Sequence, residues 1–126
     1  MIPGSNSSHP SFKKSFLFAL QGFRFAVRTE RNIKVMLGGA AFAVAMGLVL
    51  QIDLVSWAIV FLCIGCVLAA ELLNTAIETV VDLVSPEYHP LAGHAKDVAA
   101  AAVYVLCILV ALVGIAVFAH ALLSRL

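Results

Sequence analysis

The sequence predicts an all-α integral membrane protein in which an N-terminal amphipathic interfacial helix precedes three transmembrane helices. Of its 126 residues, 63% are hydrophobic and 12% are charged. A soluble domain carries about a quarter charged residues, so this chain has too little polar surface to coat a water-soluble globule of its size. The length allows a single domain. The apolar residues gather in long runs separated by short polar segments, which is the pattern of a polytopic membrane protein.

The N-terminal segment does not resemble a signal peptide, because no apolar stretch follows a basic start. Residues 1–11 are polar and rich in turn-forming residues. We therefore expect a disordered tail over residues 1–11 and one membrane domain over residues 12–126. The net charge is +1 and the longest basic run is Lys13-Lys14, which gives no indication of nucleic-acid binding.

The first helix is predicted over residues 12–31 and is amphipathic. Its apolar residues recur at three- and four-residue steps, beginning with Phe12, Phe16 and Leu20, and its basic residues fall mostly on the rest of the circumference. A helix with an aromatic face and a basic face is typical of the membrane interface. An ordinary packed amphipathic helix is the alternative interpretation.

Three apolar segments predict the transmembrane helices, at residues 33–50, 54–84 and 96–123. A bilayer core about 30 Å thick requires roughly 20 helical residues. The second segment is free of charge only as far as Ala70. It therefore spans the membrane only if its helix continues through Glu71 towards Val84.

The distribution of basic residues predicts the topology. Most of them precede the first span, the turn at residues 51–56 has none, and the loop at residues 85–97 contains Lys96. By the positive-inside rule, the N-terminus and this loop lie in the cytoplasm and the C-terminus lies outside. Small residues at a four-residue step, Gly39, Ala43 and Gly47, allow close helix approach. Since three short helices enclose a polar site poorly, we also expect self-association.

The cysteines lie inside apolar runs. Cys63 and Cys66 form a C-x-x-C pattern, which in other settings indicates redox or metal chemistry. No histidine or charged residue lies within a turn of either cysteine. We therefore expect Cys63, Cys66 and Cys107 to be free and to behave as small hydrophobic residues.

The polar residues that could take part in catalysis or metal binding form a stripe on the second predicted span. At about 100° per residue, one helix face carries Glu71, Asn74, Glu78 and Asp82. An acidic residue at the centre of a spanning helix costs about 2.5–3.5 kcal/mol, so such a stripe persists when a cation or a proton belongs to the working state. Carboxylate and amide oxygens suit Mg²⁺, which binds through one or two carboxylates, waters and substrate phosphates. The stripe predicts a carboxylate and metal site at the cytoplasmic face, with a polar seam or an ion path as the alternative.

Further polar residues are expected at the same membrane level. Glu30 precedes the first span, and Lys96 and Asp97 open the third. A lysine at a helix N-terminus is unfavourable unless an anion such as a phosphate lies nearby. The loop at residues 85–90 adds an aromatic ring and an imidazole. Neither a P-loop nor a G-x-G-x-x-G motif occurs, so a bound nucleotide would use a different kind of site.

The sequence resembles a known family in this region. Residues 71–82 fit the pattern E-[LI]-[LI]-N-[ST]-A-I-E-x-x-x-D, and E-Y-H at residues 87–89 and A-K-D at residues 95–97 follow. This combination resembles the signature of the small bacterial diacylglycerol kinase and undecaprenol kinase family. The resemblance covers about residues 12–118. It implies an ATP-dependent lipid kinase of the bacterial cytoplasmic membrane, assembled as a homotrimer whose active sites are shared between subunits.

The resemblance also implies roles for individual residues. Glu71 matches the catalytic base that takes the proton from the lipid hydroxyl, and Asn74 and Asp82 match polar residues that line the site. Glu30 and Glu78 match the ligands of the Mg²⁺ ion that accompanies ATP. The residues that match the nucleotide-contacting segment are Glu87, Tyr88, His89, Lys96 and Asp97.

The choice of lipid follows from smaller features. Leu83, Pro86 and Pro90 look more like the undecaprenol kinase branch of Gram-positive bacteria than the Gram-negative diacylglycerol kinases. We therefore expect phosphorylation of undecaprenol, with phosphorylation of diacylglycerol to phosphatidic acid as the alternative. A hypothesis from another class is an oligomeric transporter or ion-conducting protein with a protonatable carboxylate seam.

Overall fold

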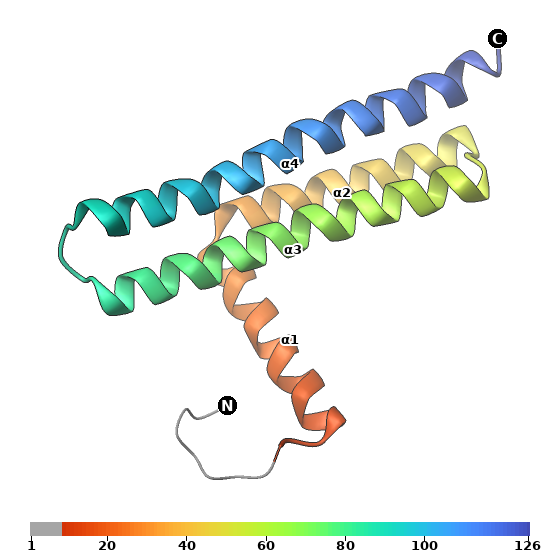
Figure 1. The fold of residues 1–126 in the computed structure, drawn as a ribbon. Helices are drawn as coiled ribbons and strands as arrows, with labels where there is room; N and C mark the ends of the chain where they lie inside the picture. Colours follow the sequence, from red (N-terminus) through yellow and green to blue (C-terminus); the bar gives the residue numbers. More distant parts are fainter. Residues whose placement is uncertain (1–8) are drawn as a thin grey trace.

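A computed structural model describes residues 9–126, and these residues form four α-helices and no β-strand (Figure 1). The helices are α1 (Phe12–Thr29), α2 (Arg31–Leu50), α3 (Leu54–Val84) and α4 (Pro90–Leu123). The predicted fold class is confirmed: one N-terminal helix precedes three helices that are long and apolar enough to cross a membrane. Most of the predicted tail, residues 1–8, lies outside the described residues.

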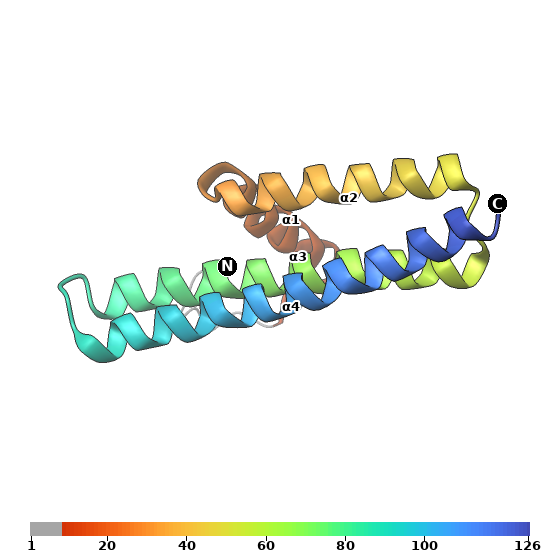
Figure 2. The ribbon, with the colours of Figure 1, turned by 90° about the horizontal axis from the view of Figure 1, so that it is seen from above.

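Helices α2, α3 and α4 pack side by side, and α1 leaves the bundle at a steep angle (Figures 1 and 2). The α2–α3 turn and the C-terminus lie at one end of the bundle, and the α3–α4 loop lies at the other. At 1.5 Å per residue, the 20 residues of α2 span about 30 Å, which matches the hydrocarbon core of a bilayer. The longer α3 and α4 continue beyond the start of α2, so the α1–α2 junction lies beside their middle (Figure 1).

The apolar side chains of the bundle face outward. At most 11% of the residues in the most apolar windows of α2, α3 and α4 are buried within the chain. Large exposed side chains include Phe42, Phe61 and Ile108. In water such a surface would be untenable, whereas in a bilayer the hydrocarbon covers it. The chain is a multi-pass membrane protein.

Local signals in the sequence fix both ends of α3. The Asp53 carboxylate accepts the Ser56 backbone N–H at 2.8 Å and caps the first turn. Hydrogen bonds from Ser56 lower the pKa of Asp53, so this cap stays charged at neutral pH. The helix ends before Ser85, which precedes Pro86, because a residue before proline is disfavoured in the α conformation.

Helix α4 begins at Pro90, six residues before the residue 96 expected from the sequence. Proline suits the first helical position, where its missing N–H would lack a partner in any case. His89 is the N-cap, and its Nδ1 accepts the Leu91 backbone N–H at 3.1 Å. The expectation placed the start where the apolar run begins and gave too little weight to this capping pair.

A single extended residue separates α1 from α2. Glu30 has φ −109° and ψ 121°, and its N–H still bonds the Ala26 carbonyl at 2.8 Å. The predicted bounds left one residue, Asn32, between the first helix at residues 12–31 and the span from residue 33, and the structure places this break two residues earlier, at Glu30. This break turns α1 away from the bundle and presents Glu30 at the junction (Figure 1).

At the end of the bundle that contains the α2–α3 turn, the C-terminus is bound to the end of α2. Gln51 ends α2 in the left-handed conformation, with φ 50°, and the Ile52 N–H bonds the Gly47 carbonyl at 3.2 Å. The Arg125 guanidinium donates to the Leu50 carbonyl and, at 3.4 Å, to Gln51 Oε1. A cation is favourable at a helix C-terminus, so Arg125 joins the end of α4 to the end of α2.

Helix α2 lies against Trp57 of α3 at Gly47, which is buried. A Cβ at this position would lie 2.7 Å from the Trp57 ring and 3.1 Å from Ile52 Cδ1. The Trp57 ring is stacked on Phe61 at 5.5 Å between centroids, so it has little freedom to move away. Of the three small residues singled out in the sequence, Gly47 makes this close approach, whereas a Cβ at Gly39 would meet nothing within 4 Å.

We therefore expect Gly47→Ala to destabilise the bundle by about 1–3 kcal/mol, the usual cost of overpacking. The matched control is Gly38→Ala on the same helix, where an added Cβ meets nothing within 4 Å. Thermal unfolding of both variants in detergent measures the difference. Equal midpoints for the two variants would contradict the close approach of α2 and α3 at Gly47.

Candidate active site

The central feature of the site is a buried carboxylate on α3. Glu71 is 1% exposed, and both of its side-chain oxygens lack a hydrogen-bond partner among residues 9–126. Asn74 and Thr75 are buried beside it, and Glu71 is the one charged side chain buried in this part of the chain. A buried polar group without a partner costs free energy. The protein retains this cost at a position where a simple apolar residue would pack.

The neighbouring polar groups on α3 form hydrogen bonds within the helix, with the exception of one oxygen of Asn74. The Thr75 hydroxyl donates to the Glu71 backbone carbonyl at 3.0 Å, and the Thr79 hydroxyl donates to the Thr75 carbonyl at 2.7 Å. Asn74 Nδ2 donates to Glu78 Oε1 at 3.3 Å, which leaves Asn74 Oδ1 buried and without a donor. The unsatisfied atoms are all acceptors, so the site suits a cation or a ligand that donates a proton.

These acceptors border a cavity of about 340 Å³ between α2, α3 and α4. Its polar lining comes from Asn32 at the start of α2 and from Glu71, Asn74 and Glu78 on α3, and α4 adds Tyr104 and Cys107. Glu71 is 17 residues, about 25 Å, along α3 from Leu54. The cavity therefore lies near one edge of the membrane-spanning region, the edge at which α1 joins α2.

Glu30 brings a further carboxylate to this region from the α1–α2 junction. It is half-buried, and both Glu30 and Glu78 are close enough to Glu71 to act on its charge. Within residues 9–126 no group of three or more His, Cys, Asp or Glu side chains is arranged to hold a metal by itself. Two carboxylates and an unpartnered amide oxygen fit Mg²⁺, which completes its shell with waters and substrate phosphates.

Two of the predicted site residues pair with each other. Lys96 on α4 forms an ion pair with Asp82 on α3, one helical turn beyond Glu78. The Asp82 side chain is 64% exposed, so the pair adds little to stability. Its effect is positional: it holds the Lys96 ammonium beside the acidic stripe. Asp97, the next residue on α4, is exposed.

The remaining predicted residues lie outside the cavity. Glu87, Tyr88 and His89 form the exposed loop between α3 and α4, and none of them lines the cavity around Glu71. Glu78 lies about 9 Å along the axis from the end of α3 at Val84. Within one chain, the structure therefore gathers Glu71, Asn74 and Glu78, with Glu30 close by, and leaves the loop at a distance.

Sequence reasoning missed three residues that line the cavity: Asn32, Tyr104 and Cys107. Tyr104 carried a signal, because it is the one hydroxyl-bearing residue between Val98 and Leu123. Asn32 lies two residues after Glu30 at the start of a helix, where a polar residue attracts little notice. Cys107 is three residues after Tyr104 and therefore lies on the same face of α4.

The unpartnered carboxylate leads to a stability prediction. Glu71→Met replaces it with an apolar side chain of similar length, so we expect the free energy of unfolding to rise by about 1–3 kcal/mol. The exposed Glu87→Gln serves as control and should leave stability unchanged. Unfolding in detergent, followed by circular dichroism, measures both variants. A Glu71→Met variant less stable than the parent chain would show that this carboxylate has a stabilising partner.

Comparison with known proteins identifies the family. A family model described as prokaryotic diacylglycerol kinase matches residues 17–118. The chain is 41% identical over 107 residues to the undecaprenol kinase of Bacillus subtilis, covering 85% of this chain and 87% of that protein. It is 37% identical over 106 residues to a diacylglycerol kinase of Synechocystis (83% and 61% covered) and 33% identical over 88 residues to that of Escherichia coli K12 (70% and 72% covered). The resemblance noted in the sequence is confirmed, and the chain belongs to the prokaryotic diacylglycerol kinase family.

Proposed function

We propose that this chain is an ATP-dependent lipid kinase that phosphorylates the hydroxyl of undecaprenol to undecaprenyl phosphate. The proposal places this reaction at the cytoplasmic face of the bacterial cell membrane. The observation that carries it is the Glu71 carboxylate, which is buried at the inner edge of the spanning region with both oxygens free. A general base must lie within hydrogen-bond reach of the hydroxyl it deprotonates, and a lipid hydroxyl resides at this membrane depth.

The proposed reaction needs few protein groups. Glu71 takes the proton of the lipid hydroxyl as the oxygen forms a bond to the γ-phosphorus of ATP. The bond between that phosphorus and the bridging oxygen breaks, and ADP leaves with the bridging oxygen. Glu30 and Glu78 would hold Mg²⁺, which when bound offsets charge on the phosphates. Asn74 Oδ1 is free to accept a hydrogen bond in the same cavity.

We assign nucleotide contacts to the cytoplasmic ends of α3 and α4. Lys96 supplies a cation for the phosphates, and its ion pair with Asp82 fixes its position. The exposed loop residues Glu87, Tyr88 and His89 and the neighbouring Asp97 are accessible to the adenosine moiety. Because these residues lie outside the cavity of their own chain, the proposal includes a homotrimer in which a neighbouring subunit completes each site.

The preference for undecaprenol rests on the relatives and on the sequence. The Bacillus protein that is 41% identical is named an undecaprenol kinase, whereas the relatives named diacylglycerol kinase are 37% identical or less. Leu83, Pro86 and Pro90 favour the same assignment. Diacylglycerol is the alternative lipid. A transport function has less support, because the cavity on the outer side of Glu71 is lined by apolar residues and cysteines alone and offers no polar path.

The proposed topology places the N-terminus and the α3–α4 loop in the cytoplasm and the C-terminus outside. The basic residues of α1 and the start of α2, together with Lys96, support this orientation. It also puts the acidic stripe on the side of the membrane where ATP is available.

The kinase activity is tested by phosphate transfer from radiolabelled ATP in mixed micelles containing Mg²⁺. We expect label in undecaprenol, with kcat/KM at least several-fold higher than for diacylglycerol at equal mole fraction. The same assay with EDTA in place of Mg²⁺ should give no product. Label in neither lipid would refute the proposal. A higher kcat/KM for diacylglycerol would make diacylglycerol the main substrate in place of undecaprenol.

Sharing of sites is tested with two variants, Glu71→Gln and Lys96→Met, that remove the base and the nucleotide contact respectively. Each variant alone should be inactive. Co-expression of both, followed by tandem purification through two different tags, should restore activity, because some sites combine an intact Glu71 and an intact Lys96 from different subunits. Sites built within single subunits would give mixed assemblies without activity.

A further inference from the structure

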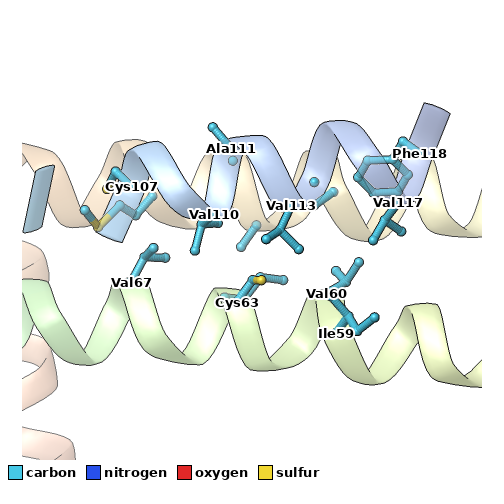
Figure 3. A pocket seen from close by; sticks show the side chains of 16 residues that line it. Ile59, Val60, Cys63, Val67, Cys107, Val110, Ala111, Val113, Val117 and Phe118 are labelled. Atoms are coloured by element: carbon cyan, nitrogen blue, oxygen red, sulfur yellow. The ribbon is translucent and has the colours of Figure 1, made fainter. Parts of the chain in front are cut away.

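A second cavity, of about 260 Å³, lies between α2, α3 and α4 on the outer side of the candidate active site (Figure 3). Side chains from α3, such as Val60 and Cys63, point towards side chains from α4, such as Val110 and Val113 (Figure 3). Helix α2 contributes small residues, among them Gly39 and Ala43. No charged residue lines this groove, so its occupant must be apolar.

The apolar groove adjoins the cavity that contains Glu71. Met36 on α2 and Cys107 on α4 line both cavities. The place where the two cavities meet is therefore close to Glu71, the buried carboxylate without a hydrogen-bond partner among residues 9–126. A cavity with free acceptors that adjoins an apolar groove suits a molecule with a hydroxyl at one end and a hydrocarbon chain behind it.

The groove runs from Glu71 towards the outer side along α3. Ile59, at its far end, lies twelve residues before Glu71, which is about 18 Å along the helix axis. A long chain whose hydroxyl meets Glu71 would therefore follow the groove through most of the membrane. A short chain would leave its outer part empty.

Another apolar cavity could hold the hydrocarbon chain of the lipid, but it does not adjoin the cavity around Glu71. It lies between α1 and α3, has a volume of about 760 Å³, and includes Phe16, Phe23 and Thr79 in its lining. It shares no lining residue with the cavity around Glu71. A chain in that cavity would lie on a neighbouring face of α3, the face of Thr75 and Thr79, whereas Glu71 lines the cavity between α2, α3 and α4.

We propose that the hydrocarbon chain of the lipid alcohol lies in the groove between α2, α3 and α4 while its hydroxyl meets Glu71. This inference rests on the proposed kinase function and specifies where the substrate binds. Bilayer hydrocarbon is as apolar as the groove, so burial of the chain there gains little hydrophobic free energy. The groove acts by orienting the chain, which keeps the hydroxyl at the base.

The first test narrows the groove at Gly39. Gly39→Leu adds a side chain on the lining face of α2, and Gly38→Leu adds the same side chain on a face that lines none of the cavities. An added Cβ meets nothing within 4 Å at either position, and thermal unfolding of both variants in detergent checks that the full leucine side chain leaves the fold intact. We expect Gly39→Leu to lower kcat/KM for undecaprenol about tenfold relative to Gly38→Leu, with the KM for ATP unchanged and with little effect on a short-chain alcohol.

Equal kinetics for the two variants with the long-chain lipid would overturn the proposal. An equal loss for long and short alcohols would also overturn it, because the defect would then not depend on a long chain in the groove. Failure of the kinase proposal has a different signature. In that case the parent chain transfers phosphate to no lipid at all.

The second test measures binding of undecaprenol in the absence of phosphate transfer. Cys63 lines the groove and Cys66, one turn along α3, does not, and both thiols are free. Alkylation of the intact protein in detergent by N-ethylmaleimide is followed for each cysteine by mass spectrometry. Undecaprenol should slow the reaction of Cys63 at least several-fold and leave Cys66 unchanged, whereas a hydrocarbon of equal length without a hydroxyl should protect neither. Protection of both cysteines, or of neither, by undecaprenol would overturn the proposal, as would a Cys63 that is fully protected before any lipid is added.

Discussion

The buried Glu71 carboxylate is the constraint on which the rest of this structure depends. Both of its oxygens lack a hydrogen-bond partner, in a chain whose other charged side chains all reach the surface or half-bury themselves. Such a group costs free energy in the absence of a ligand. Its cost is consistent with a site that must accept a proton from a lipid and tolerate the phosphates of a nucleotide close by.

The lengths of the helices place the Glu71 carboxylate near the edge of the bilayer core. Helix α2 has the length of a bilayer core, and α3 and α4 extend past its start, so the acidic stripe emerges where the hydrocarbon ends. The extended residue Glu30 turns α1 aside at the same level. At the far end, Arg125 joins α4 to α2, and Gly47 lets α2 approach α3. These outer contacts fix the helices between which the cavity and the apolar groove lie.

Much of the fold could be predicted because its signals are local. Apolar length identified the spans, and the 3.6-residue period placed Glu71, Asn74 and Glu78 on one face. The start of α4 was missed because it depends on the cap His89-Pro90 and not on hydropathy. The cavity itself could not be predicted, since Asn32, Tyr104 and Cys107 reach it only through the packing of three helices. Glu87, Tyr88 and His89 line no part of this cavity, and the nucleotide contacts proposed for them require a neighbouring subunit.

The central claim is that Glu71 acts as the base in phosphate transfer. The most direct test is a single-turnover measurement of Glu71→Gln and the parent chain, with saturating ATP and undecaprenol in the same micelles and with ATP affinity determined on the same samples. The account predicts that transfer slows at least about 100-fold, the usual contribution of a general base, while ATP affinity and oligomer size stay unchanged. Transfer by Glu71→Gln at a rate close to that of the parent chain would contradict it.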